Sequence, residues 1–312
     1  MILENVLKCV GNTPCFGLNL GNGIVHAKAE FMNPSGSVKD RVAARIIDLA
    51  IKDGSLRPGM CIAEASSGNM GISLAMAGAA YGYDVTIYMC ETASIERRNL
   101  MRMLGANVIL TPAHQSVGGA VEALKVDAVS NPNLFLVNQF SNKENILAHY
   151  NGTGKEIWAD TDGKIDCFIN GIGSGGTLMG VGSYLRERNP DVHLIAVEPK
   201  GAAALLGHKP KIHSIEGIGD GFLPEIVDPQ SIDSIIEISD SQAIKYAHML
   251  AREMGIFVGM SAGANLAAAV MIMEEHPDWR VATILPDRAE RYFSTQLFNE
   301  QNDLVDKGPA AA

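Results

Sequence analysis

The chain of 312 residues contains few cysteines, no long apolar run and few aromatic side chains. Its five cysteines form no C-x-x-C pair, which is typical of reduced intracellular thiols and excludes a small disulfide framework. No apolar run reaches about 18 residues, so a transmembrane helix is not expected. The first ten residues lack the apolar core of a signal peptide, and we therefore expect a cytoplasmic protein.

Positive charge is also scarce. Against 35 acidic residues there are 25 lysines and arginines, and the formal net charge is −10. An acidic surface without a basic patch disfavours nucleic acid and anionic membranes as partners. The eight histidines show no metal-ligand spacing, so no metal is expected. With 47% hydrophobic residues, the chain can bury a large core in two subdomains.

Short apolar runs alternate with helical segments along most of the chain. The strand-like runs are 61–64, 85–89, 107–110, 135–138, 165–170, 193–198 and 281–285, and helical segments include 94–104, 117–130 and 241–254. This alternation predicts parallel sheets wrapped by helices.

A lysine stands where the loop of residues 33–38 gives way to an apolar helix. A lysine amine is a nucleophile only when it is deprotonated, and partial burial near a helix N-terminus disfavours its charged form. Lys39 is therefore suited to Schiff-base chemistry. A solvated surface lysine at a helix start is the alternative.

A second loop, residues 65–71, joins a strand-like run to a helical one. Small hydroxyl residues and glycine at such a turn can aim backbone N–H groups at an anion. Ser66 and Ser67 add donors suited to a carboxylate, and Asn69 can donate to a ring oxygen. An ordinary helix N-cap with a glycine turn would give the same pattern.

A third loop, residues 171–177, is rich in glycine and also leads from a strand-like run into a helix. Glycines let the backbone approach a phosphate closely, and the helix N-terminus and Thr177 supply donors. The loop also matches the dinucleotide pattern G-x-G-x-x-G, and Glu198 ends the next strand-like run, roughly 20 residues on. A nicotinamide-binding site therefore stays open as an interpretation.

Together the three loops suit pyridoxal phosphate, which needs an amine partner, a phosphate pocket and a place for the substrate carboxylate. The chain resembles the cysteine synthase (O-acetylserine sulfhydrylase) branch of the fold type II pyridoxal-phosphate enzymes, with the cystathionine β-synthases as near relatives. The motifs that carry this resemblance are GNTP at 11–14, NPSGSVKDR at 33–41, SGN at 67–69, QFSN at 139–142, GSGGT at 173–177, GIG at 217–219, SAGA at 261–264, ILP at 284–286 and ERY at 290–292. A NAD-dependent oxidoreductase is then only a distant alternative.

The resemblance implies an α/β fold of two open, twisted, mostly parallel sheets flanked by helices, like the tryptophan synthase β-subunit. A smaller mobile domain is expected at residues 43–146, and a larger cofactor-binding domain at residues 1–42 plus 147–312. The resemblance also implies a homodimer, and it makes serine acetyltransferase a candidate partner.

The resemblance assigns roles to individual residues. Lys39 would hold pyridoxal 5'-phosphate as an internal aldimine and act as the base at the substrate Cα, while Asn69 would donate to the ring hydroxyl oxygen. Ser261 would face the pyridine nitrogen, and a hydroxyl there makes the ring a weak electron sink that favours loss of a β-leaving group. The phosphate would lie against Gly173, Ser174, Gly175, Gly176 and Thr177, and the substrate against Ser66, Ser67, Met70, Gln139 and Gly217.

Two positions depart from the family pattern. Met70 stands where the asparagine loop usually carries a threonine, so one hydroxyl donor is lost. The alternative is that Met70 turns into local packing and the backbone N–H binds the substrate. Asp220 stands where the family usually has a small residue, and its carboxylate could take a proton from an incoming nucleophile or from water. It would also repel a phosphorylated donor, unless it is a solvated loop aspartate.

The resemblance implies β-replacement on an activated serine through an aminoacrylate intermediate, first of all cysteine synthesis from O-acetylserine and sulfide. The protein would then be a transferase of amino-acid biosynthesis. Lyase and replacement alternatives are hydrogen sulfide release from cysteine to give serine, cystathionine formation and 2,3-diaminopropionate formation. A non-catalytic binding protein is the alternative from another class, and the intact Lys39, Asn69 and Ser261 disfavour it.

Overall fold

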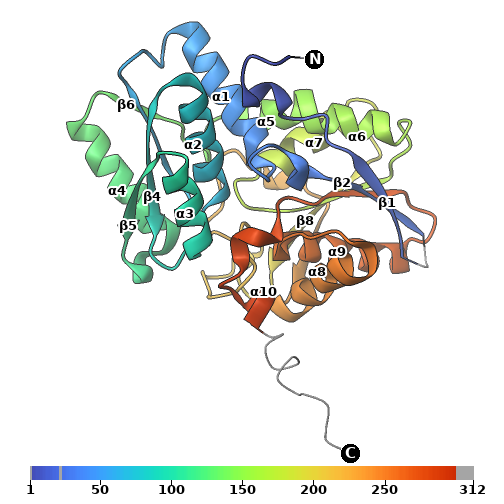
Figure 1. Cartoon of the computed structure of the whole chain (residues 1–312). Helices are drawn as coiled ribbons and strands as arrows, with labels where there is room; N and C mark the ends of the chain where they lie inside the picture. Colours follow the sequence, from blue (N-terminus) through green and yellow to red (C-terminus); the bar gives the residue numbers. More distant parts are fainter. Residues whose placement is uncertain (1, 21–22, 300–312) are drawn as a thin grey trace, which may run out of the picture.

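The computed structural model describes residues 2–20 and 23–299, in which helices cover two separate β-sheets (Figure 1). The six-stranded sheet has the order β1-β2-β10-β7-β8-β9, and the four-stranded sheet has the order β5-β4-β3-β6. Within the described residues, β1 and β2 pair antiparallel and the other neighbouring strands pair parallel. The predicted fold class is therefore confirmed. Residues 300–312, the end of the predicted larger domain, lie outside the described residues.

Each predicted strand-like run overlaps a strand. The strands are β1 Cys15–Asn19, β2 Ile24–Lys28, β3 Cys61–Ala65, β4 Asp84–Cys90, β5 Asn107–Thr111, β6 Leu134–Leu136, β7 Cys167–Gly171, β8 His193–Pro199, β9 Ser234–Ile238 and β10 Val281–Ile284. The run predicted at 135–138 extends beyond β6, which ends earlier. Strands β1, β2 and β9 were not predicted, because they lie at or next to a sheet edge and β1 and β9 are mostly half-exposed.

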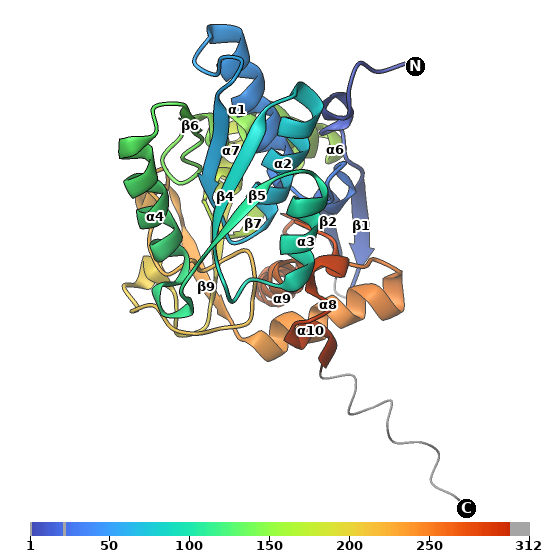
Figure 2. The ribbon, with the colours of Figure 1, turned by 60° about the vertical axis from the view of Figure 1, so that its left-hand side comes forward.

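The helices lie on both faces of each sheet. They are α1 Lys39–Asp53, α2 Asn69–Tyr81, α3 Ile95–Met103, α4 Ser116–Ser130, α5 Glu144–Ala148, α6 Lys155–Asp160, α7 Gly176–Arg186, α8 Asp240–Met254, α9 Met260–Glu275 and α10 Gln296–Asn299, with a π-helix, η4, at His149–Gly154. Figure 2 shows α4 on one face of the four-stranded sheet and α2 and α3 on the other. Ile62 and Ile87 pack in the core cluster of α1 and α2, whereas Ala63 and Tyr88 pack toward α4, as alternation along a strand requires.

The six-stranded sheet is buried in the same two-sided way. Ile169 and Val197 belong to the core cluster that contains α8 and α9, and Phe168 and Ala196 belong to the cluster that contains α7. The two sheets support the division expected from the sequence, and we propose residues 43–146 as the smaller, mobile domain and residues 1–42 plus 147–312 as the larger one.

Within the described residues, no helix combines the length and the apolar content needed to cross a bilayer. All five cysteines carry free thiols. Cys90 and Cys167 are buried, and burial raises the pKa of the Cys15 thiol to about 11. Scattered free thiols of this kind agree with the reduced state expected from the sequence.

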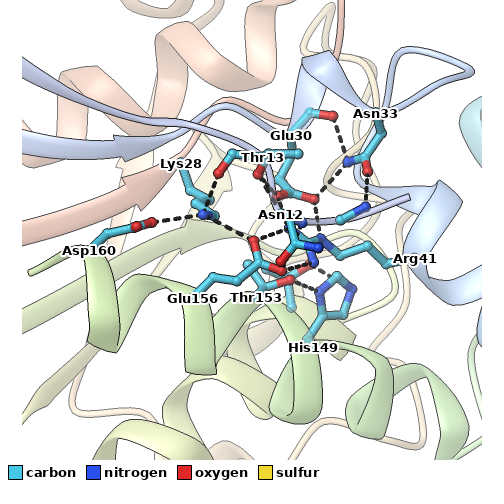
Figure 3. A network of polar contacts seen from close by, with 12 residues as sticks. Asn12, Thr13, Lys28, Glu30, Asn33, Arg41, His149, Thr153, Glu156 and Asp160 are labelled. Atoms are coloured by element: carbon cyan, nitrogen blue, oxygen red, sulfur yellow. Dashed lines mark hydrogen bonds and ion pairs between the residues drawn. The ribbon is translucent and has the colours of Figure 1, made fainter. Parts of the chain in front are cut away.

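A buried network of charges surrounds Arg41, in the first turn of α1 (Figure 3). The guanidinium donates to both carboxylate oxygens of Glu30, at 2.6 and 2.7 Å, and to both of Glu156, at 2.6 and 2.7 Å. Lys28 extends the network, because its ammonium lies 3.0 Å from Glu156 and 2.7 Å from Asp160. Paired bonds of this geometry are the strongest that a guanidinium makes. The network therefore fixes the start of α1 against β2 and α6.

We expect Glu30→Ala to lower the free energy of unfolding by about 3 kcal/mol, because a buried guanidinium loses one of its two carboxylate partners. Urea unfolding measures the effect. Glu144→Ala is the control, since it breaks the partly exposed Arg45–Glu144 pair and should cost less than about 1 kcal/mol. Equal losses in the two variants would contradict a special role for the network.

Candidate active site

A cleft opens at the carboxyl ends of the parallel strands, the usual place for a ligand in open α/β sheets. Nearly all of the residues singled out from the sequence line it. These are Lys39, Ser66, Ser67, Asn69, Met70, Gln139, Gly173, Ser174, Gly175, Thr177, Gly217, Asp220 and Ser261. The loops that carry them come from distant parts of the chain, so the fold brings together what the sequence separated.

Gly176 does not line the cleft. A Cβ at this position would lie 1.9 Å from Oδ1 of Asn145, so glycine is needed here for close packing of α7 against α5. Its assignment to the phosphate therefore concerns its backbone N–H at the N-terminus of α7, and it stays a prediction.

Lys39 is the first residue of α1, and its ammonium points to the third loop. Its Nζ lies 3.3 Å from Oγ of Ser174. Burial lowers the pKa of Lys39, while the carboxylates of Asp220 and Asp287 act in the opposite direction. A lowered pKa makes the neutral amine easier to form, as a Schiff-base lysine requires.

The third loop forms an anion cup at the N-terminus of α7. Gly175 has a φ of +84°, and a Cβ on it would lie 2.2 Å from Val227. Ser174 Oγ receives hydrogen bonds from two donors, Lys39 and Nδ2 of Asn145, the latter at 3.0 Å. The Asn145 amide nitrogen can only donate, and Lys39 also donates while it is an ammonium, so the hydroxyl proton of Ser174 is then left for an anion. The helix N-terminus adds favourable partial charge.

His149 packs against the third loop on the side away from the cleft and contacts Thr177. The side chain is fully buried, with Nδ1 2.9 Å from Oγ1 of Thr153 and Nε2 3.3 Å from Oγ1 of Thr177. Burial, and the nearby cations Lys39 and Arg41, lower the pKa of His149 well below its usual range, so the ring is neutral. A proton on Nε2 would donate to Thr177 and leave the threonine hydroxyl proton for an anion.

The second loop forms another group of donors, at the N-terminus of α2. Oγ of Ser66 accepts from the N–H groups of Gly68 and Gly71, at 3.0 and 3.2 Å, so its own proton is also left for a ligand. Gln139 donates from its side chain to Ala65 O at 3.0 Å. Its backbone N–H is held by the buried Glu64 at 2.9 Å, and burial raises the pKa of Glu64 to about 7. This arrangement suits a carboxylate.

Asp220 faces Lys39 from the loop that follows Gly217. Burial of its carboxyl group raises the pKa of Asp220, although the nearby Lys39 and Arg97 act in the opposite direction. A carboxylate with a raised pKa next to a cleft is suited to accept a proton. Asp220 is half-buried and lines the cleft, which disfavours the alternative of a solvated loop aspartate.

Arg97 lines the cleft and was not predicted from the sequence. Its side chain is fully buried, donates to Ser94 Oγ at 3.0 Å and pairs with Glu216. Its guanidinium lies 5.5 Å from the ring centre of Tyr292. In the sequence it belongs to a charged run typical of a solvated helix face, so no local signal marked it.

Glu198 lies at the end of β8, next to β7, but its carboxylate is already bonded to the backbone of the loop that follows it. Its carboxylate accepts from the N–H groups of Ala204 and Leu205, at 3.0 and 3.1 Å, and the residue is buried. The dinucleotide interpretation therefore loses the acid on which it depended.

Two further cleft residues lie in the first turn of their helices. Ser261, near the start of α9, is buried and presents a hydroxyl to the cleft. Met70, in α2, is 1% exposed and belongs to the core cluster of α1, α2 and the four-stranded sheet. Its burial favours packing as the role of this side chain.

Most of the chain is similar to known proteins. Residues 6–287 match the family model described as "Pyridoxal-phosphate dependent enzyme". The chain is 44% identical to cysteine synthase A of Escherichia coli (strain K12) over 309 residues, which cover 95% of this chain and 96% of the relative. A crystal structure of cysteine synthase from Entamoeba histolytica matches with a TM-score of 0.91 and 40% identity, over 96% of this chain and 91% of that one. A hydrogen sulfide-producing enzyme from Fusobacterium nucleatum matches with a TM-score of 0.90 and 34% identity, over 93% of this chain and 100% of that one.

We expect Met70→Thr to lower the free energy of unfolding by about 2 kcal/mol, because a buried side chain is replaced by a smaller polar one. The affinity for amino-acid substrates should stay within about twofold of the wild-type value, because the side chain at position 70 packs in the core and does not bind the substrate. Denaturant unfolding and substrate titration check both. Met103→Thr, at a position that is 88% exposed, is the control and should leave stability unchanged. Tighter substrate binding in Met70→Thr would show that the missing hydroxyl matters.

Proposed function

The chain belongs to the family of pyridoxal-phosphate dependent enzymes, and from this premise we propose that it makes cysteine from O-acetylserine and sulfide by β-replacement. The observation that carries the proposal is the position of Lys39, between one group of donors suited to a phosphate and another suited to a carboxylate. The similarity to cysteine synthases over 95% of the chain supports the substrate assignment.

The residues of the cleft fit the cofactor. Pyridoxal phosphate, when bound, supplies an aldehyde that condenses with an amine and a ring that withdraws electrons from the substrate Cα. We propose that Ser174 and Thr177, with the backbone of residues 173–176, hold its phosphate. Asn69 would donate to the ring oxygen, and Ser261 would face the ring nitrogen. The free hydroxyl proton of Ser174 and the close glycine backbone are the structural observations that support this fit.

The protein's own groups would then bind and orient the substrate. Ser66, Ser67 and Gln139 hold the substrate carboxylate at the N-terminus of α2, so that the hydrogen on Cα faces Lys39. Lys39, with its lowered pKa, takes that proton and holds it. Met70 and Gly217 complete the substrate pocket. Closure of the smaller domain over the cleft would exclude water.

A specific observation favours a second reaction within the same chemistry, the release of sulfide from cysteine to give serine. Asp220 places a desolvated carboxylate in the cleft near Lys39, where it could take a proton from water. A hydrogen sulfide-producing enzyme from Fusobacterium nucleatum has the same fold. The aspartate would thus be the catalytic residue that brings water into the reaction.

We further propose that the protein acts as a homodimer in the cytoplasm, with serine acetyltransferase as a candidate partner. The similarity to cysteine synthases supports the homodimer and the candidate partner. The five free thiols support a reducing compartment. The net charge of −10 disfavours nucleic acid and anionic membranes.

We expect the wild-type protein to be yellow with bound pyridoxal phosphate and to form cysteine from O-acetylserine and sulfide. Lys39→Ala should lose both the visible absorbance band and turnover, because no other amine is proposed to hold the aldehyde. Far-ultraviolet circular dichroism should stay unchanged, since Lys39 makes no ion pair in the described residues. Turnover retained by Lys39→Ala would refute the assignment of the lysine.

We expect Asp220→Asn to slow serine formation from cysteine at least about tenfold, and to affect sulfide addition less. The role of Asp220 as a base fixes the sign of the pH dependence, and its raised pKa moves the effect to higher pH than for an ordinary aspartate. The wild-type rate should rise with pH as the carboxyl group loses its proton, and this rising limb should be absent in Asp220→Asn. Asp191→Asn, at an exposed position, is the control. If all reactions and pH profiles are unchanged, Asp220 takes no part in catalysis.

A further inference from the structure

The side-chain amide of Asn69 is held from two sides by charged residues near the far end of the chain. Its Nδ2 donates to Oδ2 of Asp287 at 2.5 Å, and its Oδ1 accepts from Nη1 of Arg291 at 2.5 Å. Asn69 begins α2, beside the four-stranded sheet, whereas Asp287 and Arg291 follow β10 of the six-stranded sheet. These contacts therefore join the part of the cleft formed by α2 to the segment that follows β10.

The chemistry of the two partners permits one orientation of the amide. A guanidinium can only donate hydrogen bonds, and an ionised carboxylate can only accept them. Rotating the Asn69 amide by 180° would place donor against donor at Arg291 and acceptor against acceptor at Asp287. The amide nitrogen carries two hydrogens, and Asp287 takes one of them. The other is left for a ligand in the cleft, which Asn69 lines.

Both partners are themselves fixed. Asp287 is fully buried, its Oδ2 also accepts from the hydroxyl of Tyr292, and its carbonyl accepts from Gly259 N at 3.1 Å. Arg291 is 3% exposed, and its second nitrogen, Nη2, donates to the carbonyl of Ser35 at 2.8 Å. A buried group with this many bonds cannot follow Asn69 if the amide turns.

The same arginine therefore reaches both sides of the proposed cofactor. Ser35 lies in the loop that leads into Lys39, and it also bonds to Asp40, at 2.7 Å from its N–H group. Arg291 packs closely on this loop, since a Cβ at Gly36 would lie 2.6 Å from Nη2. One planar guanidinium thus links the loop of Lys39 to the amide of Asn69.

We propose that Asp287 and Arg291 are positioning residues, which fix the Asn69 amide so that its second N–H points to the ring oxygen of bound pyridoxal phosphate. The proposal rests on the proposed cofactor site. It assigns to two residues outside the cleft lining a role in cofactor affinity and in the electronic state of the ring.

The first experiment compares Asp287→Ala with Tyr292→Phe. Asp287→Ala removes the carboxylate and so releases the amide of Asn69, whereas Tyr292→Phe removes only the bond from the Tyr292 hydroxyl to that carboxylate. Each apoprotein is titrated with pyridoxal phosphate, and absorbance spectra are recorded. We expect Asp287→Ala to bind the cofactor about tenfold more weakly and to shift the visible maximum, because one hydrogen bond to the ring oxygen is lost or misdirected. Tyr292→Phe should change the affinity less than about threefold and leave the maximum in place.

Equal affinities and equal spectra for these two variants would overturn the proposal. The wild-type titration separates this failure from that of the proposed function, because a wild-type protein that binds no pyridoxal phosphate would refute the cofactor site itself. The melting temperature of each apoprotein, measured without cofactor, separates a loss of folding from a loss of positioning.

A charge-exchange pair keeps the proposal testable if Asp287→Ala does not fold. Asn69→Asp alone should lower the melting temperature of the apoprotein, because it places two carboxylates in contact. Adding Asp287→Asn should restore it, since an amide at position 287 can donate to a carboxylate at position 69. Cofactor affinity should stay low in the double variant, which has no N–H left for the ring oxygen. If the second substitution restores no stability, or if the double variant binds the cofactor as tightly as the wild type, the proposal is wrong.

Discussion

The position of the cleft lysine depends on the ion pairing of Arg41. Its buried guanidinium needs both Glu30 and Glu156, and a buried charge that lost them would cost several kcal/mol. Helix α1 can therefore begin only where Arg41 reaches both carboxylates (Figure 3). Two residues correspond to about 200° of rotation in an α-helix, so Lys39 lies on the opposite side of α1 from Arg41. The network that holds one side of the helix in place directs the other side toward the cleft.

The cleft contains hydroxyl groups whose lone pairs are occupied and whose protons are free. Ser66 accepts from two backbone N–H groups, and Ser174 accepts from Lys39 and Asn145. Such hydroxyl groups can act toward a ligand only as hydrogen-bond donors, and this favours anionic ligands over neutral or cationic ones. The two serines lie in different loops, each at the N-terminus of a helix, so the cleft is prepared for a molecule with anionic groups at two places and a reactive centre near Lys39.

The three loops could be predicted because each one is a local signal. Each combines glycine and hydroxyl residues with a helical run that follows, and the second and third loops also follow a strand-like run. Strands β1 and β9 could not be predicted, since half-exposed edge strands carry little alternation, and β2 was missed next to the edge strand β1. Arg97 was missed because a charged run in a helix normally faces solvent. It is buried here because Glu216 and the ring of Tyr292 meet it, and both come from far along the chain. The packing role of Met70 likewise depends on the core cluster around it.

The sequence by itself determined which chemical groups stand at the turns between strands and helices, because a turn and its helix N-terminus are made by consecutive residues. Only the tertiary structure decided which of those groups are already bonded and which way they point. Asn69 finds its two partners 218 and 222 residues away, and the direction of its remaining N–H follows from them. A hydrogen bond depends on distance and angle in space, and for residues so far apart in the chain these are set by the packing of the two sheets and not by the local sequence.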